Sequence, residues 1–353
     1  TGYLLLLSLG LAVPFFFAAN CIGLSFYRFG KISGRIYSAD LTGAGVGAIG
    51  VIVFLFLVPP LSALVYLSAL GMLAGVINCR RSPWFVSLML TCIILLVLFL
   101  PSRLHLQLSP YKSLSQILQI QGAEQRQERS SPLGLLTVVA SPQVPFRYAP
   151  GLSLNASHEP PPQLGIFNDG EGPIILTRYQ GNPESLGYLD YLTSALPYHL
   201  REQPKTLILG AGGGHDVLQA VYHQARAVDA VESNPQVVQL VNEDYVDFTG
   251  HIYQRPEVRL HTAGGRNFIQ GTRETYDVIQ LALVDDFAVA NAGLSALSEH
   301  YLHTQEALSQ LLSRLKPDGL LSFTRWLKLP PRDALKLFAT AVAVLEEQGR
   351  APA

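Results

Sequence analysis

The stretch Thr206-Leu-Ile-Leu-Gly-Ala-Gly-Gly-Gly-His-Asp216 runs from an apolar segment into a cluster of glycines, and it decides the fold of the C-terminal half. A helical pattern follows over residues 217–225, and then a second β-rich segment, Arg226-Ala-Val-Asp-Ala-Val-Glu232. This order predicts a strand, a loop, a helix and a second strand that ends in an acid.

The glycine cluster and the acid fit a nucleotide-like ligand. Glycines at 210, 212 and 214 allow positive φ and close approach of the backbone to a ligand. Glu232 lies 22 residues beyond Gly210, near the roughly 20-residue spacing at which such folds place an acid on ribose hydroxyls. The alternative is a tight turn followed by a solvated strand end. The predicted ligand-binding residues are Gly210, Ala211, Gly212, Gly213, Gly214, Asp216, Glu232 and Ser233.

Strands and helices continue to alternate after Glu232, which predicts a parallel sheet covered on both faces. The expected strands are 258–261, 276–282 and 319–325, and the expected helices are 235–245, 266–270, 304–315 and 331–347. Because ligands bind at the carboxyl ends of such strands, we expect one crevice there. Its expected members are Gly210 to Gly214, Glu232, Gly264 to Arg266 and Ala282 to Asp285.

Short apolar runs broken by Pro, Gly and Asn precede this region and predict a small β subdomain. The expected strands are 117–120, 133–140, 164–168 and 174–177, with a hairpin turn at Asp169-Gly170. An amphipathic helix is expected over 186–200, with Tyr188, Asp190 and Tyr191 at the mouth of the glycine loop. The alternative is that these aromatic side chains belong to the core.

The N-terminal region is almost uncharged. Before Leu100 it holds five basic residues and one acidic residue, so the remainder holds 20 of the 25 basic and 25 of the 26 acidic residues. Apolar runs at 3–26, 41–58, 61–77 and 84–100 predict about four membrane spans, the second and third separated by Pro59-Pro60. The chain starts without Met, so residue 1 is expected to lie inside a longer protein. The positive-inside rule and a cytoplasmic nucleoside disagree on the side of the membrane, which stays open.

Composition also excludes some classes of function. The chain has no basic stripe for neutralising phosphates, so nucleic acid is not an expected partner. The cysteines, Cys21, Cys79 and Cys92, fall in or beside apolar runs, so no thiolate zinc site is expected. Four histidines, at 158, 199, 215 and 223, show no ligand-like clustering with carboxylates. We therefore expect no metal.

These residues resemble the spermidine synthase-like (aminopropyltransferase) branch of the class I S-adenosylmethionine-dependent methyltransferase fold. The resemblance covers roughly residues 115–350, and the Arg35-Ile-Tyr-Ser-Ala-Asp40 loop is similar to bacterial multi-pass membrane proteins that carry such a domain. It implies that the glycine loop and Glu232 hold S-adenosylmethionine or its decarboxylated form. By the same resemblance, Gly264, Gly265 and Arg266 contact the nucleoside, and Tyr188 and Asp190 contact the second substrate.

Three positions depart from the family pattern. The soluble synthases have Gly-Gly-Gly-Asp-Gly-Gly where this chain has the methyltransferase-like loop of Gly210 to Asp216. Their Asp-Ser-Ser-Asp is Ala282-Leu-Val-Asp285 here, so the first carboxylate, which helps to deprotonate the amine, is missing. Gly264 stands where relatives have an acid that contacts adenine. Asp285 is then the residue expected to contact the amine and serve catalysis.

We therefore predict a transmembrane domain at 1–104, a β-rich subdomain with its connecting helix at 105–200, and a Rossmann-like domain, truncated at its C-terminal end, at 201–353. The expected function is membrane-anchored, spermidine synthase-like transfer of an aminopropyl group to a polyamine. The alternatives are a methyltransferase acting on a small molecule or lipid, and a non-catalytic sensor of a nucleoside or polyamine. The expected location is the bacterial cytoplasmic membrane, with the lipid bilayer as partner and a homodimer as an open expectation.

Overall fold

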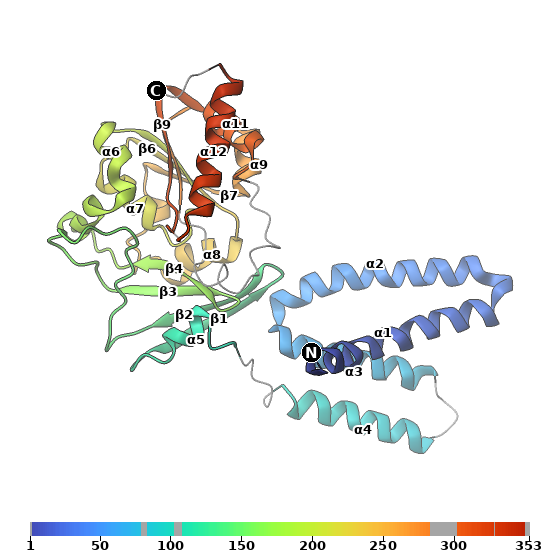
Figure 1. Cartoon of the computed structure of the whole chain (residues 1–353). Coiled ribbons are helices and arrows are strands. Elements are labelled where there is room, and N and C mark those ends of the chain that lie inside the picture. The colour runs from blue at the N-terminus through green and yellow to red at the C-terminus, as the bar shows by residue number, and fades with distance from the viewer. Residues whose placement is uncertain (1, 79–82, 102–107, 283–301, 328, 350–353) are drawn as a thin grey trace. The chain divides into compact units, whose positions relative to one another are not determined.

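The computed structural model describes residues 2–78, 83–101, 108–282, 302–327 and 329–349 (Figure 1). Contacts between Cα atoms divide the chain into two units, Thr1–Val58 and Pro59–Ala353. The first unit holds two long apolar helices. The second begins with two more and continues into the β subdomain and the parallel sheet.

The first unit consists of α1 (Gly2–Arg28) and α2 (Ser33–Leu57), joined by a 3₁₀ turn at Gly30–Ile32. Helix α1 continues through Pro14. The loop expected at Arg35 to Asp40 is instead the beginning of α2, which is a correction of the prediction. That segment contains neither Gly nor Pro, so nothing in it opposes helix formation once the helix has started at Ser33.

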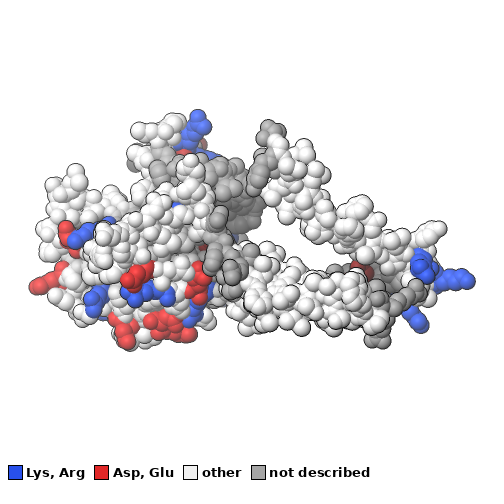
Figure 2. Space-filling view, turned by 90° about the horizontal axis from the view of Figure 1, so that it is seen from below, with Lys and Arg blue, Asp and Glu red and all other residues white. Residues whose placement is uncertain are grey.

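Among the residues that the structure describes, three helical segments are long and apolar enough to cross a membrane: Leu5–Arg28, Gly30–Leu57 and Pro60–Ile77. They correspond to α1, to α2 with its preceding turn, and to α3 (Pro60–Asn78). Helix α4 (Pro83–Phe99) is shorter, at 17 residues, and packs against α3. Figure 2 shows the long helices with an almost entirely uncharged surface, and with basic side chains gathered near one end.

An antiparallel sheet forms the β subdomain, with the strand order β1-β2-β3-β4. Its strands are β1 (Glu124–Ser131), β2 (Gly134–Ala140), β3 (Gln163–Asn168) and β4 (Glu171–Thr177). The Asp169-Gly170 hairpin is confirmed, and both residues have positive φ, 50° and 80°. Strand β1 was not predicted, because its sequence is polar. It is an edge strand, and its Arg129 pairs with Asp244 at 2.6 Å.

Two further predictions in this region are wrong. Residues 117–120, expected as a strand, follow directly from the short helix α5 (Ser113–Ile117), whose Leu114 is buried. The helix expected over 186–200 is broken into three pieces: 3₁₀ turns at Pro183–Tyr191 and Thr193–Ala195, and α6 (Leu196–Leu200). Pro183 and Pro197 each start a piece because proline suits the first turn of a helix.

The Rossmann-like part is a parallel sheet, as predicted, and its strand order is β7-β6-β5-β8-β9. Its strands are β5 (Lys205–Leu209), β6 (Ala227–Glu232), β7 (Val258–Thr262), β8 (Tyr276–Leu281) and β9 (Leu315–Phe323). Its helices are α7 (His215–Tyr222), α8 (Pro235–Gln239) with a π turn at Leu240–Asp244, α9 (Gly265–Gly271), α11 (Gln305–Ser313) and α12 (Arg332–Glu347). The strand order reverses at β5, which marks the place where such sheets bind ligands.

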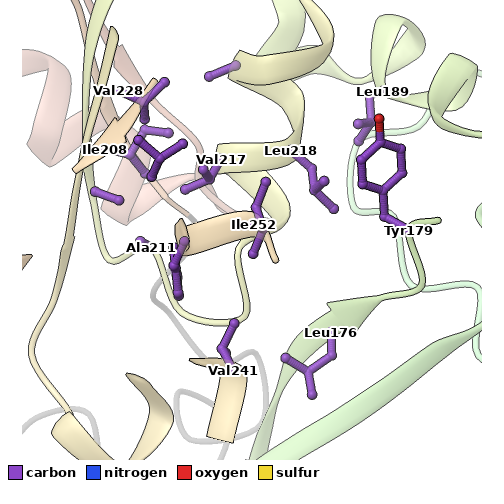
Figure 3. Close-up of a cluster of buried hydrophobic side chains, with 14 of the residues drawn as sticks. Leu176, Tyr179, Leu189, Ile208, Ala211, Val217, Leu218, Val228, Val241 and Ile252 are labelled. Carbon is purple, nitrogen blue, oxygen red and sulfur yellow. The ribbon is translucent and has the colours of Figure 1, made fainter. Parts of the chain in front are cut away.

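Alternate residues at the end of β5 enter two different cores, which explains why its last three residues, Leu207 to Leu209, are all apolar. Ile208 packs with side chains of α7 and α8, whereas Leu207 and Leu209 pack with those of α9 and α11. The first core also takes in Leu176 of β4, so the β subdomain is joined to the sheet by continuous apolar packing (Figure 3).

Candidate functional site

The glycine loop has the positive φ angles that the sequence predicts. Gly210, Gly212 and Gly214 have φ values of 82°, 53° and 86°, a region that favours glycine. Gly213 is needed for a different reason, because a Cβ there would overlap the Ile175 carbonyl of β4. The loop is thus pressed against the β subdomain as well as exposed to a crevice.

The Glu232 side chain points from the end of β6 toward this loop. It is 7% exposed. Its Oε2 accepts a hydrogen bond from the Gly212 N–H at 2.9 Å, and its Oε1 accepts one from the Asn234 N–H at 2.8 Å. A carboxylate offers about four acceptor positions, so capacity remains for a ligand diol. Asn234 in turn caps α8, because its Oδ1 accepts a hydrogen bond from the Gln236 N–H at 3.0 Å.

A cavity of about 540 Å³ lies beside the loop, within the size range of small-molecule sites. Its lining includes the loop, the end of β6 and the β3–β4 hairpin, and four carboxylates take part: Asp169, Glu171, Asp216 and Glu232. Among the described residues that line it there is no Lys or Arg. One of these acids, Glu171, forms an ion pair with Lys112, whose Nζ lies 3.5 Å from its carboxylate. The cavity therefore favours a cationic ligand.

Asp216 lies at the start of α7, on the inner wall of this cavity. Burial raises the pKa of its carboxyl to about 6, and the hydrogen bond that it accepts from Gln280 Nε2 at 2.9 Å opposes the rise. Its neighbour His215 also lines the cavity, and burial lowers the pKa of that imidazole to about 4. At neutral pH His215 is uncharged, whereas most Asp216 is ionised but close to accepting a proton.

Two tyrosine hydroxyls contact the glycine loop and His215. The Tyr253 hydroxyl donates to the Gly212 carbonyl at 2.7 Å, and the Tyr188 hydroxyl lies 3.5 Å from His215 Nδ1. Tyr188 is fully buried, so the structure places it in the core beside the site rather than among the lining residues. Sequence analysis did not predict a role for Tyr253. No sequence pattern connects its 3₁₀ turn, Ile252–Gln254, with Gly212, which lies 41 residues earlier.

Several predicted site residues lie elsewhere. Gly264 and Gly265 begin α9, and Arg266 Nη1 donates to Thr304 Oγ1 at 3.3 Å; none of the three lines the cavity. Asp190 contacts His199 and His223 near the C-terminal end of α7. Asp285 lies outside the described residues. Of the expected crevice members, Gly210 to Gly213, Glu232 and Ala282 come together, whereas Gly214 does not line the cavity.

The sequence also missed two acids of the cavity. The sequence predicts a turn at Asp169 and indicates no role in a site for Glu171. They reach the cavity because the β subdomain packs against the glycine loop, a tertiary contact with no local sequence signal. Ser233, which was predicted, also lines the cavity, and its Oγ lies 3.4 Å from Glu232 Oε1.

Comparison with known proteins points to one family. Residues 188–325 match a family model described as the spermine/spermidine synthase domain. A polyamine aminopropyltransferase of Korarchaeum cryptofilum is 25% identical over 148 residues, which are 42% of this chain and 42% of that protein. This part of the chain is therefore similar to the spermine/spermidine synthase domain.

A second curated protein and a solved structure are also similar to parts of this chain. A polyamine aminopropyltransferase of Lachnoclostridium phytofermentans is 28% identical over 116 residues, which cover 33% of this chain and 38% of that protein. The chain thus spans about two fifths of the length of these curated relatives. Spermidine synthase from Thermotoga maritima aligns with a TM-score of 0.40 and 18% identity, over 63% of this chain and 62% of that structure.

The region that matches the family model includes the loop, Glu232 and Asp216. Because the match begins at Tyr188, it leaves out the β3–β4 hairpin that brings Asp169 and Glu171 to the cavity. The apolar helices of residues 2–78 and 83–99 also lie outside it.

Proposed function

We propose that the chain is a membrane-anchored transferase that binds an S-adenosyl nucleoside and passes its aminopropyl group to an amine. The single observation that carries this proposal is the cavity, which combines the glycine backbone with four carboxylates and has no Lys or Arg among its described lining residues. Decarboxylated S-adenosylmethionine carries a sulfonium and an ammonium group. Both charges are complementary to this lining.

Glu232 would hold the ribose of this substrate. Its two oxygens are fixed by the Gly212 and Asn234 N–H groups, so the carboxylate is oriented before the ligand arrives. A fixed acceptor loses little conformational entropy on binding, which favours affinity. The open glycine backbone leaves room for the sugar and the thioether next to it.

Asp216 would receive the proton that the attacking ammonium must lose. A carboxyl with a pKa near 6 is mostly ionised at pH 7, and its basicity suits general-base catalysis. The neutral amine then attacks the carbon bonded to the sulfonium. The C–N bond forms as the C–S bond breaks, and the electron pair of the broken bond stays on sulfur, so methylthioadenosine leaves. Asp285, the residue expected to contact the amine, stays a prediction.

A methyltransferase is the second candidate, and one observation favours it. Ala282 lines the cavity at the end of β8, where the resemblance leads us to expect a carboxylate. Such a site offers one acid fewer to hold a polyamine. Intact S-adenosylmethionine would then be the ligand, and a methylated product would form.

The test uses the full chain in detergent, incubated with putrescine and either decarboxylated or intact S-adenosylmethionine. We expect mass spectrometry to find an aminopropylated product and methylthioadenosine with the decarboxylated form. Methylated product from the intact form would favour the second candidate. Binding of either nucleoside without any product would identify a sensor instead and overturn both enzymatic functions.

A further inference from the structure

Three side chains that could bind a metal come together away from the cavity. Asp190 belongs to the 3₁₀ turn Pro183–Tyr191, His199 to α6, and His223 follows the last residue of α7. One ligand atom from each lies within 4.8 Å of the other two. This corrects the expectation that these histidines do not cluster with carboxylates, which only the folded chain could reveal because 33 residues separate Asp190 from His223.

The distances are close to those of a tetrahedral zinc site. Asp190 Oδ1 lies 3.2 Å from His199 Nε2 and 3.7 Å from His223 Nε2. Zinc binds nitrogen and oxygen ligands at about 2.0–2.1 Å, so two of its tetrahedral ligands lie roughly 3.3 Å apart. The ligand atoms of the remaining pair, His199 and His223, lie within 4.8 Å of each other, so a zinc ion would fit between the three side chains after side-chain adjustment.

His223 supplies an independent observation. Its side chain is 11% exposed, and its Nε2 is buried without a hydrogen-bond partner among the described residues. Leaving a buried polar atom unpaired is unfavourable, and a metal ion would pair it.

Neighbouring aromatic rings hold the His223 imidazole in place. The Tyr198 ring stacks on it, with centroids 5.2 Å apart and an angle of 5° between the planes, and the Tyr222 ring meets it edge-on at 5.1 Å. The other two ligands are reachable from solvent, because the side chains of Asp190 and His199 are 39% and 50% exposed. A fixed imidazole beside two accessible ligands leaves an entry path and open positions for water.

We propose that Asp190, His199 and His223 form a zinc site with water completing the coordination. Two imidazoles and one carboxylate suit zinc better than magnesium or calcium, which prefer all-oxygen ligands. The site would tie the 183–200 segment to the end of α7. It would act as a structural brace, since the eight residues of α7 put it roughly 12 Å from the start of that helix at the cavity.

The test is a zinc titration of the full chain, made without a histidine tag, purified in detergent and stripped with EDTA. We expect calorimetry with zinc chloride to show one tight site. His199→Ala and Asp190→Asn should each weaken it at least about tenfold, since loss of even outer-shell partners has that effect. The control is His158→Ala, which removes an exposed histidine outside the cluster and should leave affinity unchanged.

Equal zinc affinity in wild type and in both cluster variants would overturn the proposal, as would equal weakening by His158→Ala. Circular dichroism in EDTA checks that each variant folds. A second measurement needs no variant: cobalt(II) bound to the wild-type chain should give the intense visible bands of four-coordinate geometry. The pale spectrum of six-coordinate cobalt would contradict the tetrahedral site.

Discussion

The two ends of α7 carry the same residue types in different surroundings. At its start, His215 and Asp216 face the inside of a cavity, where burial lowers the pKa of the histidine and raises that of the aspartate. At its end, His223 meets His199 and Asp190, and two of these three side chains are open to solvent. The surroundings make the first pair suited to moving a proton and the second cluster suited to binding a metal.

Tyr198 physically joins these two places. Its ring stacks on His223, while its hydroxyl donates to Gln280 Oε1 at 2.8 Å. The same Gln280 side chain donates to Asp216 Oδ1 at 2.9 Å. The proposed zinc site and the proposed base are therefore linked through Tyr198 and Gln280.

The largest effect on the cavity end is expected from Gly213→Ala. The new Cβ would overlap the Ile175 carbonyl, so β4 and the loop must move apart, at a cost of about 1–3 kcal/mol or more. We expect a lower urea midpoint and loss of nucleoside binding.

Gly271→Ala is the matched control, because a Cβ there meets nothing within 4 Å. It should leave both properties near wild type. If the two variants behave alike, the loop is not pressed against β4.

Asp216→Asn tests the base at the cavity end. The amide cannot take up a proton, so we expect the turnover rate to fall about 10²-fold while nucleoside affinity changes much less. The wild-type rate should fall as the pH drops below about 6, since Asp216 becomes protonated there. A rate insensitive to this substitution would assign the base to another group.

The pH dependence of stability should separate His215 from Asp216. Because folding raises the pKa of Asp216, the contribution of this residue to the free energy of unfolding decreases as the pH rises from 3.8 toward about 6. Because folding lowers the pKa of His215, the contribution of this residue to the free energy of unfolding decreases as the pH falls from 6.5 toward about 4. The two slopes oppose each other in the wild type.

Asp216→Asn should remove the contribution of Asp216 and leave that of His215. The free energy of unfolding of the variant should then rise relative to that of the wild type by roughly 1–3 kcal/mol between pH 4 and 6. His215→Gln should give the opposite difference. Urea unfolding across this range measures both, and parallel curves for all three proteins would rule out the buried titrations.

The smallest effect is expected at the other end of α7. In EDTA, His199→Ala removes a partly exposed pair with Asp190, and such pairs contribute about 0–1 kcal/mol. The melting temperature without metal should barely change, whereas zinc should raise it in the wild type and not in the variant. A large loss in EDTA would mean that the cluster stabilises the fold without zinc.

How far the sequence predicted this molecule depends on whether a feature is local. The order of strands and helices from Thr206 to Phe323 follows from apolar runs and glycines, and the fold confirms it. Strand β1 was missed because edge strands can be polar.

The candidate site also contains residues that the sequence could predict and residues that it could not. The loop and Glu232 could be predicted from spacing, because both belong to one strand-loop-helix-strand unit. Asp169, Glu171 and the cluster around His223 could not be predicted, since distant segments bring them together. The placement of Gly264 to Arg266 at the cavity rested on resemblance, and here those residues begin α9 without lining it.

The central claim is that the glycine loop and Glu232 hold an S-adenosyl nucleoside, and calorimetric titration of the full chain with decarboxylated S-adenosylmethionine tests it most directly. We expect binding that Glu232→Gln weakens about 10- to 100-fold, because a charge-assisted acceptor for the diol is lost. Glu274→Gln, which changes an exposed acid beside Lys205, should bind like wild type. Equal affinity in the Glu232 and Glu274 variants, or no binding by the wild type, would contradict the account.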